Sequence, residues 1–200
     1  MGTQLGPSCL KTEYLYNNLK NLGCEVVDFD VIKDMPIIND KLKYHNTKNF
    51  VEVGKVNEKV SSILIICLNK QYLYSEKILK KLAHSVCSAI ENDFVPIILG
   101  GDHSLAIGSV YGSSSALSKI HGDPTIMGSG MGLIWIDAHA DINTPLTSST
   151  GNLHGQPVSF ILHELDKYLP GLQGFEWNLS CLPARNLVYI GLRDIDPAET

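Results

Sequence analysis

The sequence predicts an α/β fold of three layers, in which a mainly parallel β-sheet lies between two layers of helices. Apolar runs at 94–99, 133–136 and 186–190 have the length and composition of buried strands, and segments with helical spacing lie between them. Strands that alternate with helices are typical of parallel sheets. A chain of 200 residues can bury one core, so we expect a single domain over 1–200.

The first half of the chain is predicted to be mostly helical. Helices are expected over about 9–22, 49–60 and 75–91, with a short strand at 25–29. Ser8 is suited to capping the first helix and Gly23 to ending it. The segment SEKILKKLAHSVCSAIE at 75–91 has apolar residues at helical spacing, which predicts an amphipathic helix.

The second half contains three predicted strands, each of which ends in a polar cluster. A helix over 104–111 and a loop over 112–132, rich in glycine and serine, follow the strand at 94–99. The strand at 133–136 is continuously apolar, as expected for burial on both faces. A polar loop at 142–156, a helix at 157–167 and a loop at 170–183 then lead to the last strand. Ligands of open α/β sheets bind at the carboxyl ends of strands, so all three clusters could form one site.

Composition and charge indicate a globular protein that acts on a small molecule. Hydrophobic residues make up 44%, charged residues 18%, and the formal net charge is −5. No basic stripe suggests nucleic acid, and the most apolar short run, 63–68, is too short to span a membrane. The five cysteines include no Cys-x-x-Cys pair, which favours reduced thiols in a reducing compartment.

The segment DAHADINTPLTSSTGNLHGQP at 137–157 carries most of the predicted chemistry. Asp137, His139 and Asp141 occupy alternate positions after a strand, so on an extended chain they share one face. His103 follows the preceding strand in GGDHS and offers an imidazole at the same edge. This nitrogen and oxygen set without a thiolate suits Mn²⁺, with Zn²⁺ or Fe²⁺ as alternatives, and bridging carboxylates would allow two ions that activate a water.

For each of these residues, a purely structural role is the alternative to metal binding. Without a cation, two carboxylates at the end of a buried strand would repel each other and be costly to bury. That argument favours a metal site at 137–141. It does not extend to the other histidines, which are interpreted as ordinary core or surface residues: His45, His84, His121 and His163.

Together these motifs resemble the arginase branch of the ureohydrolase family. The matching runs are GGDHSLAIGS (100–109), IDAHADINTPLTSSTGNLHGQPVSF (136–160) and VYIGLRDIDPAE (188–199). The resemblance implies an arginase/deacetylase-like fold, a homotrimer, and a binuclear manganese centre that hydrolyses L-arginine to L-ornithine and urea. An agmatinase is the alternative within the family, and the TSSTGN loop disfavours it because agmatine has no α-carboxylate to bind.

The resemblance also implies roles for single residues in the reaction. His103, Asp137, His139 and Asp141 would bind the two Mn²⁺ ions. Asp141 would also orient the hydroxide that attacks the guanidinium carbon, and His154 matches a histidine that shuttles protons. The positions that match substrate-binding residues are His139, Asn143, Thr150, Gly151, Asn152, Asp196 and Glu199.

Within this substrate-binding set, two parts of the substrate are recognised separately. Asn143, Thr150 and Asn152 match residues that bind the α-carboxylate. Thr150 stands where serine is more usual, but it keeps the hydroxyl. Asp196 matches the carboxylate that takes the α-amino group, and Glu199 would assist through water.

The chain departs from the family pattern in three places. The family's Asp-x-Asp metal pair on a later strand is not reached by Thr200, and a first strand with a glycine-rich loop is missing before GPSCL. Asp194 and Asp196 have the right spacing for such a pair, but they lie in the run that resembles the amine-binding segment. The run at 61–75 fits the family poorly and is interpreted as an insertion.

These departures lead to expectations about activity and location. We expect an incomplete sheet, weak binding of Mn²⁺, and slow or absent hydrolysis of arginine by this chain. A non-catalytic truncated isoform that associates with full-length subunits is the alternative. A cytoplasmic location is expected, with a mitochondrial one left open because the amino terminus looks incomplete.

Overall fold

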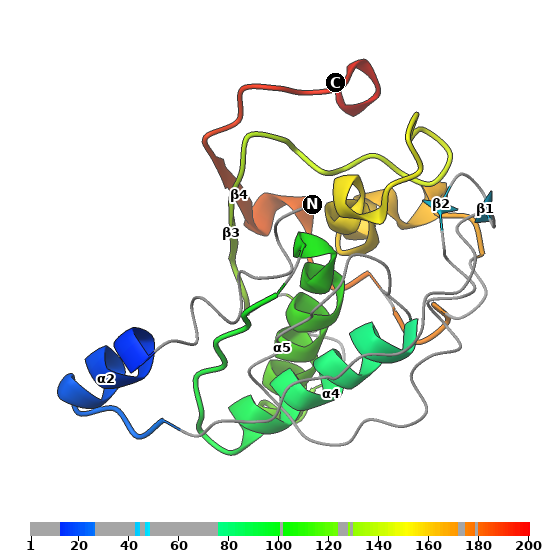
Figure 1. Cartoon of the computed structure of the whole chain (residues 1–200). Coiled ribbons are helices and arrows are strands. Elements are labelled where there is room, and N and C mark those ends of the chain that lie inside the picture. The colour runs from blue at the N-terminus through cyan, green and yellow to red at the C-terminus, as the bar shows by residue number, and fades with distance from the viewer. Residues whose placement is uncertain are drawn as a thin grey trace.

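The computed structural model describes residues 13–26, 43–44, 47–48, 76–100, 102–123, 128, 130–171, 175–178 and 180–200. The α-helices among them are α2 (Glu13–Asn21), α4 (Glu76–Glu91) and α5 (Ala106–Ile120) (Figure 1). The strands are β1 (Lys43–Tyr44), β2 (Thr47–Lys48), β3 (Leu133–Ile136) and β4 (Leu187–Ile190). Short 3₁₀ turns lie at His103–Leu105, Leu153–Gly155, Pro157–Phe160, His163–Tyr168, Ala184–Asn186 and Pro197–Glu199.

Strands β3 and β4 form a parallel pair that confirms the predicted α/β class. The register runs from Leu133 opposite Leu187 to Ile136 opposite Ile190. Trp135 is buried at 7% exposure, whereas Ile134 and Ile136 on the other face are 63% and 76% exposed. The prediction that this strand is buried on both faces is therefore wrong, because no described element covers the face that carries the two isoleucines. Strands β1 and β2 form a separate antiparallel pair.

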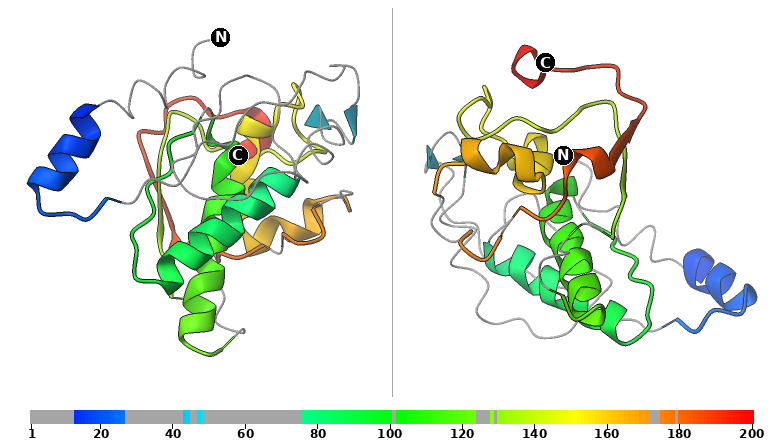
Figure 2. Two further views of the ribbon diagram at one scale, coloured as in Figure 1. Left: turned by 60° about the horizontal axis from the view of Figure 1, so that its bottom comes forward. Right: turned by 180° about the vertical axis from the view of Figure 1, so that it is seen from behind.

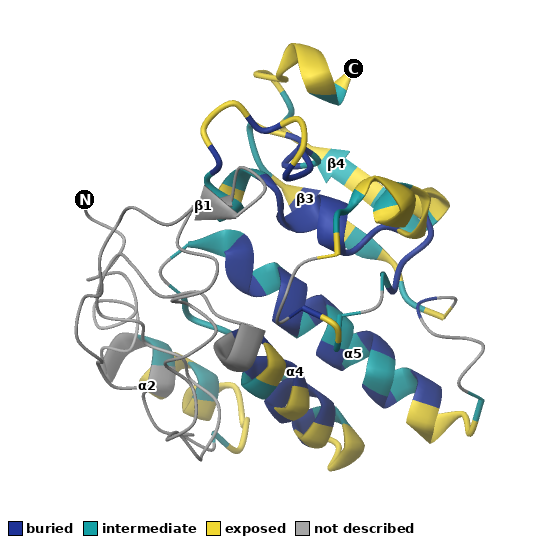
Figure 3. Ribbon diagram, turned by 90° about the vertical axis from the view of Figure 1, so that its right-hand side faces the viewer, coloured by how far each residue is buried: buried dark blue, intermediate teal, exposed yellow. Residues whose placement is uncertain are grey.

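Helix α5 lies between α4 and the β3–β4 pair (Figures 1 and 3). One side of α5 contributes Ile107 to a core cluster that includes Leu79 and Leu82 of α4. Its other side contributes Val110 to a second cluster that includes Trp135 of β3. Because the start of α5 lies next to the end of β3, the residues just before this helix reach the polar edge of the sheet. Helix α2 stands apart from these elements (Figure 2).

The packing of α4 against α5 depends on glycines. A Cβ atom added to Gly108 would lie 2.4 Å from the carbonyl oxygen of Leu79, and one added to Gly112 would lie 2.3 Å from that of Ala83. The prediction of a loop over 112–132 is wrong for its first part, since α5 continues to Ile120. Glycine weakens an isolated helix, but here it permits the close approach that buries the α4 side chains, and packing outweighs propensity.

Two further predictions need correction, and several lie outside the described residues. The segment 94–99 forms no ladder with any described strand, and Phe94, Val95 and Ile97 are 39%, 87% and 42% exposed. The helix predicted over 157–167 is two 3₁₀ turns, because Leu162 forms a parallel bridge with Leu182 between them. The helix at 75–91 is confirmed as α4, and the one at 9–22 is described as α2. The segments 49–60, 61–75 and 27–29 are not described.

Candidate metal centre

The 3₁₀ turn before α5 places His103 at the edge of the sheet. The Asp102 carboxylate starts this turn, since its Oδ1 accepts hydrogen bonds from the Ser104 N–H at 2.9 Å and from the Ser104 hydroxyl at 2.5 Å. Gly100 precedes the turn, and a Cβ there would lie 2.1 Å from Cδ1 of Leu105. The backbone before His103 is thus fixed by a side-chain cap, and a Cβ at position 100 would require the Leu105 side chain to shift.

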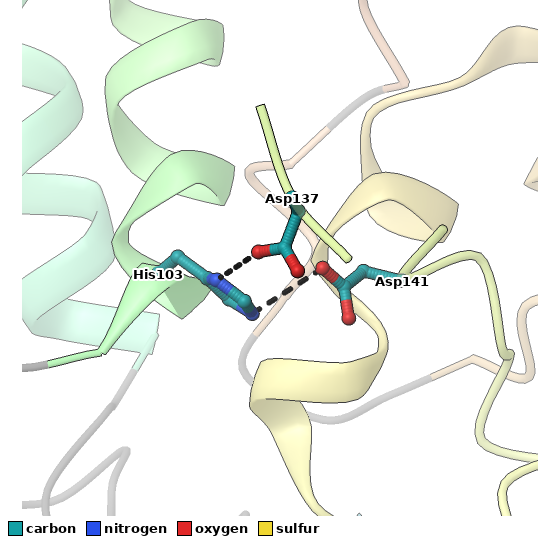
Figure 4. A group of neighbouring side chains, drawn as sticks. All are labelled: His103, Asp137 and Asp141. Atoms are coloured by element: carbon teal, nitrogen blue, oxygen red, sulfur yellow. Dashed lines mark ion pairs between the residues drawn. The ribbon is translucent and has the colours of Figure 1, made fainter. Parts of the chain in front are cut away.

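The His103 ring lies between two carboxylates (Figure 4). Its Nδ1 is 3.2 Å from Oδ2 of Asp137, and its Nε2 is 3.4 Å from Oδ2 of Asp141. One ligand atom from each of the three residues lies within 4.8 Å of the others, and no second such group occurs in the described part of the chain. The structure therefore brings together three of the four predicted metal ligands. One imidazole and two carboxylates fit a divalent ion such as Mn²⁺.

The two carboxylates differ in their electrostatic environment. Burial raises the pKa of Asp141, and the charge of Asp137 raises it further against the opposing effects of His103 and Trp135. Burial also acts on Asp137, but hydrogen bonds from His139 and the charge of His103 outweigh it, so the pKa of Asp137 is lowered. A bound cation would stabilise the ionised form of both residues, most of all the buried Asp141.

Asp141 is held by groups that the sequence analysis did not single out. The Trp135 indole N–H donates to Oδ2 of Asp141 at 3.1 Å, and the Tyr189 hydroxyl donates to the Ala140 carbonyl at 2.7 Å. The Trp135 ring centroid also lies 5.4 Å from that of His103. The alternation in β3 offered a signal, because Trp135 and Asp137 share a strand face and a buried indole N–H requires an acceptor.

His139 and His154 flank this three-residue group. The His139 N–H donates to Oδ1 of Asp137 at 3.0 Å, and its ring Nε2 is 3.5 Å from Oδ2 of Asp194. The His139 side chain is 54% exposed and is not among the three residues that converge. The His154 ring centroid is 6.3 Å from that of His103, whose Nε2 donates to the His154 carbonyl.

The remaining predicted site residues fall into two sets. Asn143, Asp196 and Glu199 are joined, since the Asn143 amide donates to Oδ2 of Asp196 at 2.9 Å and Glu199 accepts from the Asn143 N–H at 3.2 Å. Thr150, Gly151 and Asn152 lie in a turn where the Asn152 N–H donates to the Thr150 hydroxyl at 3.2 Å. Gly151 has a φ of 70°, which glycine adopts without strain.

Asp194 and Asp196, whose spacing resembles a metal pair, have different partners here. Asp194 faces His139, whereas Asp196 faces Asn143. The two carboxylates therefore do not converge on one point.

Comparison with known proteins identifies the family of the chain. The model of the Arginase family matches residues 1–200. The chain belongs to the arginase family. It is 40% identical over 198 residues to Arginase-1 of Homo sapiens, covering 99% of this chain and 51% of that protein. It is 38% identical to the mitochondrial Arginase-2 of Bos taurus, of which it covers 47%.

Solved structures of this family share the fold. The arginase from Bacillus subtilis aligns with a TM-score of 0.64 at 30% identity, covering 98% of this chain and 53% of that one. The arginase from Entamoeba histolytica, solved in complex with L-ornithine, aligns with a TM-score of 0.68 at 23% identity over 100% of this chain and 54% of that one. The chain thus spans about half the length of the relatives it matches. None of the described helices is long and apolar enough to cross a membrane.

Proposed function

We propose that this protein is a manganese-dependent ureohydrolase that converts L-arginine and water into L-ornithine and urea. The observation that carries the proposal is the convergence of His103, Asp137 and Asp141 at the end of β3 in a chain of the arginase family. Its relatives are named arginases, and one of them was solved with L-ornithine.

The metal would be held by His103, Asp137 and Asp141, with His139 as a further ligand after its ring turns from Asp194. Bound there, the ion would lower the pKa of a coordinated water so that hydroxide is available near neutral pH. Asp141 is suited to orienting that water, because Trp135 fixes the carboxylate by donating to one oxygen. His154 lies beside His103 with an exposed side chain, which suits proton exchange with solvent.

Substrate recognition is proposed to rest on the two polar sets. Thr150, Gly151 and Asn152 would meet the α-carboxylate together with Asn143, and Asp196 would meet the α-amino group. A small cationic substrate also agrees with the net charge of −5. A homotrimer in the cytoplasm completes the proposal, with the mitochondrion as the alternative because the bovine relative carries that location in its name.

Urea release from L-arginine by the purified chain, with and without added Mn²⁺, tests this proposal. We expect slow release of urea that requires the metal, loss of this activity in Asp141→Ala, and partial loss in His154→Ala. Agmatine serves as the competing substrate, and Glu164→Ala, which removes a carboxylate bound to the Ala184 N–H, is the matched control. Failure of wild-type protein to bind Mn²⁺ or release urea would contradict the proposal, and preference for agmatine would replace it with an agmatinase.

A further inference from the structure

We infer that Glu199 is a positioning residue that holds the backbone after Asp141, and thereby the Asp141 carboxylate, in its metal-binding arrangement. The inference rests on the proposed function, and it gives Glu199 a task other than contact with the substrate. The loop 137–143 follows β3 at the edge of the sheet, and we call it the rim loop.

The rim loop has a backbone conformation that needs external support. Asp141 has a φ of 53°, in the left-handed region that side chains other than glycine seldom adopt. Asp141 is also 4% exposed, so its side chain is confined within the fold. The backbone conformation at this position is unfavourable in isolation, so neighbouring groups must hold the turn.

The segment after β4 supplies much of this support. The Arg193 and Asp194 N–H groups donate to the Ala138 carbonyl at 2.9 Å and 3.0 Å. The Tyr189 hydroxyl reaches the Ala140 carbonyl, as described above. Each of these contacts holds the loop on the amino-terminal side of Asp141.

Glu199 holds the other side of Asp141. Its Oε1 accepts from the Ile142 N–H at 3.0 Å and from the Asn143 N–H at 3.2 Å, the two amides that follow the left-handed residue. Its Oε2 accepts from the Asp196 N–H at 3.0 Å, which closes a capping box at the last turn of the chain. A single carboxylate therefore ties the rim loop to the segment 196–199 across 56 positions of sequence.

These contacts distinguish Glu199 from its neighbour Asp196. Both lone pairs of Oε1 are used by backbone amides, and Oε2 is directed at the N–H of its own turn. A carboxylate that accepts several amide hydrogen bonds orders the backbone that donates them, and the bonds are stronger than those of a neutral acceptor. The Asp196 side chain accepts from the Asn143 amide and from the Glu199 N–H of the capping box, but it is exposed, so it retains acceptor capacity toward a substrate amine.

The test compares Glu199→Ala and Glu199→Gln with the wild-type protein. In the metal-free protein, amide hydrogen exchange is measured at Ile142 and Asn143, and NMR follows the indole N–H of Trp135, which reports its bond to Asp141. Glu164→Ala is the matched control, because Glu164 also accepts from a backbone amide, that of Ala184 at 2.9 Å, away from the rim loop. Mn²⁺ affinity, kcat and KM are then measured on the same proteins.

We expect Glu199→Ala to exchange at both amides about tenfold faster, to shift the Trp135 signal, and to bind Mn²⁺ roughly 10–100-fold more weakly, with KM changed less than about twofold. Glu199→Gln keeps one acceptor oxygen and should restore most of the protection and metal affinity. Two outcomes would overturn the inference. One is equal protection from amide exchange in wild type and Glu199→Ala. The other is an equal rise in KM in Glu199→Gln and Glu199→Ala with unchanged Mn²⁺ affinity.

The metal-free readouts separate this inference from the proposed function. If wild type releases no urea, the proposed function fails, while exchange and the Trp135 signal still decide what Glu199 holds. If wild type is active and Glu199→Ala leaves both readouts unchanged, only the inference fails. A variant that unfolds is replaced by Glu199→Asp, which keeps the charge but is one methylene too short to reach the loop.

Discussion

The α4–α5 helix pair and the rim loop are neighbours in the fold, but they are held in opposite ways. The helices meet where side chains are absent, since Gly108 and Gly112 leave no room for a Cβ atom beside the α4 backbone. The rim loop is held by hydrogen bonds from side chains: Tyr189 and Glu199 bind its backbone, and Trp135 binds the Asp141 carboxylate.

This difference separates the sources of stability from the sources of function. The helix pair is sensitive to added volume, and it buries the apolar residues that stabilise the chain. The rim loop is sensitive to the loss of single polar groups, and it carries a buried carboxylate that costs stability without a cation. Substitutions in the two regions should therefore change different measured quantities.

The largest effect is expected at the helix contact, in Gly112→Ala. Alanine favours a helix over glycine by about 1 kcal/mol, yet its Cβ would meet the carbonyl oxygen of Ala83, a backbone atom that moves only with α4. We expect the free energy of unfolding to fall by about 2–3 kcal/mol in denaturant titrations, because the helices must separate. Ser113→Ala on the same helix should change it by less than about 0.5 kcal/mol. Increased stability of Gly112→Ala would show that the α4 backbone at Ala83 moves away from the added Cβ at little cost.

The sequence predicted those parts of the fold that depend on local patterns, and it did not predict the parts that depend on contacts between distant segments. The strands β3 and β4 and the helix α4 could be predicted, because apolar length and helical spacing are local properties of the chain. The length of α5 could not be predicted, since GSSSALSKI reads as a loop until α4 is known to lie against its glycines. The segment 94–99 has the composition of a strand, but strand formation requires a neighbour that composition does not reveal.

The residues of the candidate site could be predicted from the sequence, but the contacts that hold them could not. His103, Asp137 and Asp141 could be grouped from the sequence, because each follows a predicted strand that ends at the same edge. The partners of Asp141 could not, since Tyr189 and Glu199 lie 49 and 56 or more positions from the backbone groups they bind. Such contacts depend on how β4 is paired with β3, which spacing alone does not determine.

A smaller effect of opposite sign is expected at the rim loop, in Asp141→Asn. Burial raises the pKa of Asp141 above 3.8, so its contribution to stability is complete below that pH and is lost as the pH rises through the folded-state pKa. At pH 7 the metal-free variant should therefore be more stable than wild type, by on the order of 1 kcal/mol. The amide oxygen of the variant can accept from Trp135 in place of Oδ2 of Asp141. Thermal unfolding across pH 3–8, with and without Mn²⁺, checks this.

Added Mn²⁺ should reverse the order of the two proteins. Wild type should gain thermal stability from the metal, and Asp141→Asn should gain little, because binding stabilises only a state that binds. A variant that is less stable than wild type without metal at pH 7 would indicate that the carboxylate supports the fold rather than the site.

The smallest effect concerns Cys181, whose thiol reports on the core beside α5. Burial raises the pKa of this thiol from 9.0 to about 12, with Ser114 of α5 acting weakly against it. About a thousandfold less thiolate is then present than in an ordinary thiol, so alkylation at pH 8 should leave Cys181 intact while the exposed Cys24 reacts. Peptide mass spectrometry measures both. Gly112→Ala should accelerate the labelling of Cys181, because a less stable chain opens more often and then exposes the thiol, whereas Glu199→Ala should leave the labelling unchanged. Equal acceleration in both variants would mean that the helix pair and the rim loop open as one unit.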